Sequence, residues 1–151
     1  MNYPAAPEFT GAATSGLEIT SVGLRGKPFV IYFYPKDNTP GCTTEAQQFR
    51  DLHGEFVAAG CPVLGVSRDS LKSHEGFRAK LGLPFELIAD TDETLCQLFE
   101  VIKMKNMYGK QVRGIERSTF VVDAEGNLRR EWRGVKVNNH AQEVLDFVRT
   151  L

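Results

Sequence analysis

The stretch FYPKDNTPGCTT, residues 33–44, places a cysteine where it could act as a nucleophile. A hydrophobic run ends at Pro35, a second proline and a glycine follow, and helical spacing begins around Cys42. If Thr39 is the N-cap and Pro40 the first helical residue, Cys42 lies in the first turn, where N–H groups lack intrahelical partners. Those donors and the positive end of the helix dipole favour the thiolate, the nucleophilic form of cysteine.

The start of a helix does not by itself hold Cys42 ionised. A cysteine that is almost fully ionised at neutral pH needs about 3.4 kcal/mol of extra preference for the anion. A helix terminus usually supplies about 0.3–1 kcal/mol and at most about 2, so we expect a cation nearby. Full ionisation gains only about 30-fold in rate. Fast chemistry therefore also needs donors aimed at the transition state, and we expect the Thr39 hydroxyl and the first-turn N–H groups among them.

The alternative for any free cysteine is a thiol that only packs in the core. Cys61 opens an apolar run and Cys96 lies among Leu95, Leu98 and Phe99, so we interpret both as buried structural thiols. Cys42 lacks such a setting, which favours a chemical role for it.

The elements around Cys42 alternate between strand-like and helix-like patterns. We predict buried strands over residues 28–34, 61–67 and 85–90, and helices from Pro40 to Gly60, over 70–82 and over 92–102. Residues 103–114 are predicted as a polar loop, 117–123 and 127–134 as a hairpin, and 138–151 as a closing helix; the first 27 residues are predicted as loop with a short strand pair. This order predicts one α/β domain, residues 1–151, built as a three-layer sandwich with a mixed central sheet.

The overall composition excludes several classes of protein. With 151 residues, a net charge of −1 and a pI near 6.3, the chain has no basic field for nucleic acid or an anionic membrane. No apolar run is long enough to span a membrane, and the N-terminus lacks a signal-peptide pattern. Three cysteines do not form a secreted disulfide framework, so we expect a reduced, cytoplasmic compartment.

Other sequence motifs for chemistry are missing. The three histidines have no metal-ligand spacing, there is no C-x-x-C or P-loop, and a Cys-x₅-Arg phosphatase loop would need arginine where Gln48 stands. These residues therefore give no motif for a zinc site, a phosphate-binding loop or a dinucleotide site.

The segment YPKDNTPGCTTEAQQFRD resembles the peroxiredoxins, and among them the Q-type, or bacterioferritin-comigratory, subfamily. Pro35, Thr39 and Cys42 fit the Pro-x-x-x-Thr/Ser-x-x-Cys signature. The segments VLGVSRDS, KMKNMYGK, GIERSTFVVDAEG and WRGVKVNNHAQEVL are similar to the same subfamily in the same order, so that the resemblance runs from about residue 28 to the end. It implies a thioredoxin-like fold and the reduction of hydrogen peroxide and organic hydroperoxides by a cysteine, with no metal and no bound organic cofactor.

The resemblance also implies a role for each matching residue. Cys42 is the expected peroxidatic nucleophile, which attacks the peroxide and becomes a sulfenic acid. Thr39 is expected to hydrogen-bond the peroxide and the thiolate, and Pro35 to pack over the site. Arg117 matches the active-site arginine and would be the expected cation, able to contact the peroxide oxygens through its planar fork.

The chain departs from the subfamily where a resolving cysteine is common. Gln47 and Arg78 occupy the two positions that match it. We therefore hypothesise a one-cysteine enzyme that an external thiol reduces, such as a thioredoxin, glutaredoxin or glutathione system, and that is a monomer. Two other hypotheses remain: a thioredoxin-like redox sensor whose Cys42 oxidation is a signal, and a non-catalytic structural domain with an unreactive Cys42.

Overall fold

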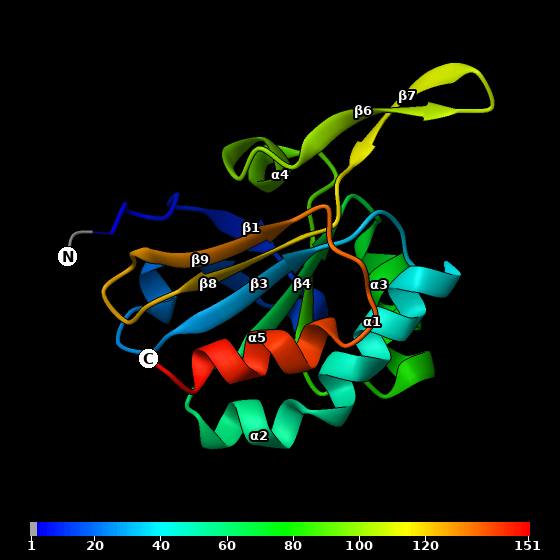
Figure 1. Ribbon diagram of the computed structural model, residues 1–151. Helices are drawn as coiled ribbons and strands as arrows, with labels where there is room; N and C mark the ends of the chain where they lie inside the picture. The colour runs from blue at the N-terminus through cyan, green and yellow to red at the C-terminus, as the bar shows by residue number, and fades with distance from the viewer. Residues whose placement is uncertain (1–2) are drawn as a thin grey trace.

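The computed structural model, described for residues 3–151, is organised around a five-stranded mixed sheet (Figure 1). The strand order is β5–β4–β3–β8–β9, with bounds Glu86–Ala89, Val63–Ser67, Phe29–Phe33, Ser118–Val122 and Leu128–Arg133. β3, β4 and β5 run parallel, whereas β8 pairs antiparallel with both β3 and β9. This is the predicted sheet, with parallel strands in the middle of the chain and an antiparallel hairpin at one side.

Helices and a short strand pair cover the two faces of the sheet. One face packs against α1 (Pro40–Asp51), α2 (His53–Ala58), α3 (Leu71–Leu81) and α5 (His140–Val148). The other packs against α4 (Thr94–Leu98) and the N-terminal segment with β1 (Thr10–Ala12) and β2 (Glu18–Thr20). Two 3₁₀ turns, Thr14–Gly16 and Val22–Leu24, complete that segment. The predicted three-layer sandwich is confirmed.

The central strands are buried on both faces, as their continuous apolar runs predict. All five residues of β3 and all five of β4 are buried. Alternate β3 side chains enter the two hydrophobic clusters, with Tyr32 on the α1 side and Phe33 on the α4 side. Burial on both faces fixes where β3 ends, and this end positions the loop that leads to Cys42.

The prediction of a polar loop over residues 103–114 is wrong. This segment forms a hairpin of β6 (Ile102–Met107) and β7 (Lys110–Ile115), which projects from the body (Figure 1). Tyr108 and Gly109 connect the strands with φ of 54° and 78°, as in the two-residue turns that match the strand twist. Most of the hairpin is exposed on both faces, so its sequence lacks the apolar alternation of a half-buried strand.

Two helices also differ from their predicted lengths. The helix after Pro40 is interrupted at Leu52, whose φ and ψ of −96° and 1° separate α1 from α2. The helix predicted over 92–102 covers only Thr94–Leu98, because Glu100 has a φ of 56° and β6 begins at Ile102. Among residues 3–151, no helix combines the length and apolar character needed to cross a bilayer.

Candidate active site

Cys42 lies at the start of α1, beyond the carboxyl end of β3. Thr39 is the N-cap, with extended backbone angles, and Pro40 is the first helical residue, as predicted. The first N–H of the helix with a backbone partner is that of Thr43, which donates to the Thr39 carbonyl at 2.9 Å. The N–H groups of Gly41 and Cys42 precede it and are available to an anion. The Cys42 side chain is only 1% exposed, so the sulfur lies within this turn rather than on the surface.

Arg117 reaches Cys42 from the neighbouring strand. In the antiparallel β3–β8 pair, Phe33, the last residue of β3, lies opposite Ser118, the first residue of β8. Arg117 immediately precedes Ser118 and therefore lies beside the carboxyl end of β3. The guanidinium nitrogen NH2 of Arg117 is 3.4 Å from Sγ of Cys42. Gly41 makes this approach possible, since a Cβ at that position would be 3.2 Å from NH2. The structure thus brings a cation to the sulfur at the distance of a charge-assisted contact.

Glu45 is a member of the site that the sequence interpretation missed. Its Oε1 accepts a hydrogen bond of 2.7 Å from NH1 of Arg117, whose NH2 contacts Cys42. Glu45 is fully buried, and its Oε2 has no hydrogen-bond partner among residues 3–151. Burial raises the pKa of Glu45 to about 7, although Arg117 opposes the shift. The signal in the sequence was its spacing: a carboxylate three residues after Cys42 lies on the same side of the helix.

One guanidinium therefore serves two acceptors, the thiol sulfur and the buried carboxylate. Burial disfavours the charge of Arg117, but Glu45 and Cys42 outweigh it and raise the pKa of the guanidinium. The fork of Arg117 is held by Glu45 at one nitrogen and directed at Cys42 with the other. Such a fixed orientation provides a positive charge at the sulfur without reorganisation during a reaction.

Thr39 and Pro35 lie on the loop between β3 and α1. The Thr39 hydroxyl donates to the Lys36 carbonyl at 2.8 Å, three residues earlier, instead of capping the helix. Its single hydrogen is therefore not directed at Cys42, which differs from the expectation that Thr39 is a donor to the thiolate; its oxygen lone pairs remain able to accept a hydrogen bond. Pro35 follows Tyr34 and is partly buried at the rim of a cavity.

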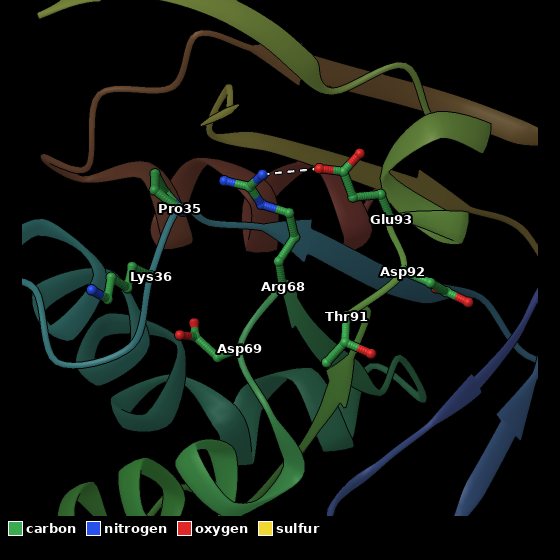
Figure 2. A pocket seen from close by; sticks show the side chains of 7 residues that line it. All are labelled: Pro35, Lys36, Arg68, Asp69, Thr91, Asp92 and Glu93. Carbon is green, nitrogen blue, oxygen red and sulfur yellow. Dashed lines mark hydrogen bonds and ion pairs between the residues drawn. The ribbon is translucent and has the colours of Figure 1, made fainter. Parts of the chain in front are cut away.

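That cavity, of about 390 Å³, lies at the carboxyl ends of the three parallel strands (Figure 2). It is lined by Pro35, Lys36, Arg68, Asp69, Thr91, Asp92 and Glu93. Arg68 donates to Glu93 at 2.9 Å across it, as the dashed line shows. Cys42 and Arg117 are not among the lining residues, so the cavity does not contain the sulfur; Pro35 and Lys36 connect it to the loop that leads to Cys42. The contact between Arg117 and the Cys42 sulfur is therefore separate from this hollow.

A buried polar cluster anchors the loop before Cys42. Oδ2 of Asp37 lies 2.7 Å from Nδ1 of His74, Oδ1 accepts from the Tyr34 hydroxyl at 2.6 Å, and Ser73 donates to Oδ2 at 2.8 Å. The backbone N–H of Asp37 donates to Asp69 at 2.9 Å. Asp37, Asp69 and His74 present ligand atoms within 4.8 Å of one another, the arrangement of a possible cation site. Because the Asp37 oxygens and Nδ1 are already hydrogen-bonded to each other and to neighbours, we interpret the cluster as structural.

The other two cysteines are distant from the sulfur of Cys42. Cys61 precedes β4 whereas Cys42 follows β3, so they lie at opposite ends of parallel five-residue strands, about 16 Å long. Cys96 belongs to the hydrophobic cluster on the opposite face of the sheet. Burial raises the pKa of Cys61 to about 12, and burial and Asp90 also raise that of Cys96. Both are buried thiols without the setting of a nucleophile, as predicted, and no disulfide joins the cysteines within residues 3–151.

Comparison with known proteins gives a consistent result. Residues 4–131 match the AhpC/TSA family. Peroxiredoxin Bcp of Xanthomonas campestris is 57% identical over 146 residues, which cover 96% of this chain and 91% of that protein. Peroxiredoxin Bcp of Bacillus subtilis is 44% identical, covering 97% of this chain and 93% of that protein. A solved structure of the X. campestris bacterioferritin comigratory protein, from work on its alkyl peroxide reduction, has a TM-score of 0.90 at 52% identity and covers 94% of this chain and 90% of that chain.

Proposed function

This chain belongs to the AhpC/TSA family and is a peroxiredoxin, a thiol-dependent peroxidase, and on that premise we propose that Cys42 is its peroxidatic nucleophile. The Cys42 thiolate attacks the terminal oxygen of a hydroperoxide, which keeps its hydrogen. The O–O bond breaks, and the departing alkoxide or hydroxide takes a proton from the solvent to give alcohol or water. The sulfur keeps one oxygen and becomes a sulfenic acid. The substrates are hydrogen peroxide and organic hydroperoxides; the solved X. campestris relative was studied for alkyl peroxide reduction.

The observation that carries this assignment is the 3.4 Å contact between Arg117 and the sulfur of Cys42 at the first turn of α1. Arg117 stabilises the thiolate and the charge that develops on the departing oxygen. The free N–H groups of Gly41 and Cys42 add donors from the helix start. Thr39, whose hydroxyl hydrogen is donated to the Lys36 carbonyl, accepts a hydrogen bond from the O–H of the hydroperoxide and so orients the substrate. Pro35 closes one side of the site and limits access of water to the sulfenic acid.

We also propose that this is a one-cysteine enzyme recycled by an external thiol. The distance to Cys61 exceeds the span of roughly 7 Å between Cα atoms that a disulfide allows, and Cys96 is screened by the sheet. A first thiol therefore displaces water from the Cys42 sulfenic acid to form a mixed disulfide, and a second thiol releases the Cys42 thiolate. Three unpaired cysteines fit a reduced compartment such as the cytoplasm. The redox-sensor alternative is not favoured, because the relatives are peroxiredoxins.

Steady-state peroxide consumption with dithiothreitol tests the role of Cys42. We expect Cys42→Ser to abolish turnover and Cys61→Ser, Cys96→Ser and their double variant to retain it. Full activity in Cys42→Ser would exclude the assignment, and a single turnover that then stalls in the wild type would restore the sensor hypothesis. Sedimentation velocity tests the proposed monomer.

Mass spectrometry after one equivalent of peroxide tests the one-cysteine mechanism. We expect a single added oxygen on the Cys42 peptide, with Cys61 and Cys96 still reduced. A dominant Cys42–Cys61 or Cys42–Cys96 disulfide would contradict it. The Cys61→Ser/Cys96→Ser double variant is the matched control, because it cannot form either linkage.

A further inference from the structure

The β6–β7 hairpin is exposed along most of its length. Tyr108 at its turn is 100% exposed, and Met104, Met107 and Val112 are also exposed large hydrophobic side chains. Residues 102–115 contain four basic residues, Lys103, Lys105, Lys110 and Arg113, and no acidic one. A projecting ribbon that combines exposed apolar side chains with charge of a single sign is typical of a surface that binds another macromolecule.

One face of this hairpin is continuous with the active site. Side chains alternate along a strand, so Lys103, Lys105 and Met107 share a face of β6. The register places Gly114, Val112 and Lys110 beside them on β7. We call the set Lys103, Lys105, Met107, Lys110 and Val112 the Lys105 face. At its base, the Lys105 ammonium donates to the Ile115 carbonyl at 2.5 Å, two residues before Arg117.

Lys105 lies close enough to the catalytic centre to respond to its charges. Burial, followed by the positive charge of Arg117, lowers the pKa of Lys105, while Cys42 opposes the shift. Gly114 faces the Lys105 stem and the Arg68 guanidinium, each about 4 Å from where a Cβ would lie. The Lys105 face therefore begins at the rim of the site and extends outward along six-residue strands, about 20 Å.

We propose that the Lys105 face is the docking surface for the reductant of Cys42, and that this reductant is a dithiol protein with an acidic, partly apolar surface around its reactive cysteines. The inference rests on the proposed function, in which an external thiol must reach a sulfur that is only 1% exposed. A small thiol would contact the base of the hairpin alone, whereas the exposed methionine, valine and lysines extend to its far end. Lys103 and Lys110 form no ion pair within residues 3–151, so their charge is free to attract an acidic partner.

A second copy of this chain is a poorer occupant of the same surface. A two-fold symmetric contact would place the three lysines of one Lys105 face against those of the other, and like charges would oppose it.

The redox step with a dithiol protein is balanced. One partner thiolate attacks the Cys42 sulfenic acid and water leaves; the second partner thiolate then breaks the mixed disulfide, so that the partner is oxidised by two electrons and the Cys42 thiolate is restored.

Matched charge reversals test the proposal. The probe is an acidic thioredoxin recycled by its NADPH-dependent reductase, with dithiothreitol as the small dithiol for comparison. For Lys103→Glu/Lys110→Glu we expect kcat/KM for thioredoxin to fall about tenfold, with a weaker salt dependence. The rate of Cys42 oxidation by peroxide and kcat/KM for dithiothreitol should stay within about twofold. The control Lys27→Glu/Lys80→Glu reverses two exposed lysines elsewhere and should change nothing.

Met107→Ser tests the apolar part of the Lys105 face without touching the core, and we expect a smaller loss with thioredoxin only. Equal losses with dithiothreitol, or no loss with thioredoxin, would overturn the docking surface. The docking surface would also be overturned if the wild type turned over with dithiothreitol but with neither thioredoxin nor glutaredoxin. A change in the oligomeric state of the charge variant in sedimentation would overturn it as well. A wild type that consumes no peroxide with any thiol would instead refute the proposed function.

Discussion

Asp37 and His74 form a fully enclosed carboxylate–imidazole pair, with Oδ2 and Nδ1 2.7 Å apart. The other ring nitrogen, Nε2, lies 2.9 Å from the carbonyl oxygen of Ile88. Burial disfavours the Asp37 carboxylate, but hydrogen bonds from His74 and Tyr34 outweigh burial and lower the pKa of Asp37. Nδ1 thus lies beside a carboxylate oxygen and Nε2 beside a backbone carbonyl oxygen. The pair fastens the loop before Cys42 to α3 and β5.

Removal of the His74 ring should destabilise the protein strongly. For His74→Gln we expect the free energy of unfolding to fall by about 3–5 kcal/mol, because an uncompensated Asp37 carboxylate is left buried. His53→Gln, at a half-buried position in α2, should cost less than about 1 kcal/mol. Urea denaturation measures both. An effect of His74→Gln no larger than that of His53→Gln would show that the buried Asp37 carboxylate does not depend on the His74 ring, and Asp37→Asn added to His74→Gln should recover part of the loss.

Glu45 should give the stability an unusual dependence on pH. Its pKa is raised by burial from 4.5 in the unfolded chain to about 7 in the fold, so the folded state holds a proton that the unfolded state has lost. Its contribution is fully present below pH 4.5 and is lost as the pH rises towards 7. The loss is of order 3 kcal/mol. Urea titrations at pH 5 and 7.5 should show this fall in the wild type, and Glu45→Gln should remove most of it; an unchanged slope in Glu45→Gln would assign the dependence to other groups.

Arg117→Lys tests whether the planar fork matters beyond its charge. A lysine keeps the positive charge but cannot hold Glu45 with one nitrogen and direct a second at Cys42. We expect the second-order rate of Cys42 oxidation to fall about 10²-fold, within the range for loss of one oriented donor. Competition for peroxide with a peroxidase of known rate measures this. Arg149→Lys, in an exposed pair with Glu55, is the control and should be neutral; a near-normal rate in Arg117→Lys would reduce the role of Arg117 to charge alone.

The strand-to-helix corner around Cys42 could be predicted from its own residues, because Thr39, Pro40 and the apolar run before them act locally. Arg117 could not be found in this way. Its contact with Cys42 spans 75 positions and depends on the pairing of β3 with β8. The link between Asp37 and His74 is of the same kind, since neither residue marks the other in the sequence. Local sequence patterns thus predicted most of the helices and strands. The charged contacts between these elements could not be predicted without knowing which strands pair and in which register.

The hairpin shows a different limit. A strand is identified in a sequence by the alternation of apolar and polar residues that results when one of its faces is buried. Almost no residue of β6 and β7 is buried, so this alternation is missing. Their pairing depends on the backbone ladder and the turn at Tyr108–Gly109, which composition alone presents as a polar loop. A segment without a hydrophobic face is predicted as loop even where it is a regular ribbon.

Gly41→Ala tests the closeness of Arg117 to the helix start. The new Cβ would lie 3.2 Å from the guanidinium, closer than an ordinary van der Waals contact, so Arg117 must shift by a few tenths of an ångström. Alanine favours the helix more than glycine, so we expect unchanged or slightly higher thermal stability together with a fall of about tenfold in the rate of Cys42 oxidation. Gly54→Ala in α2, where no atom lies within 4 Å of the new Cβ, should raise stability by up to about 1 kcal/mol and leave the rate unchanged. If Cys42 in Gly41→Ala is oxidised at the wild-type rate, as in the Gly54→Ala control, Arg117 can be displaced without loss of function. Its effect on the sulfur would then not depend on the close contact that Gly41 permits.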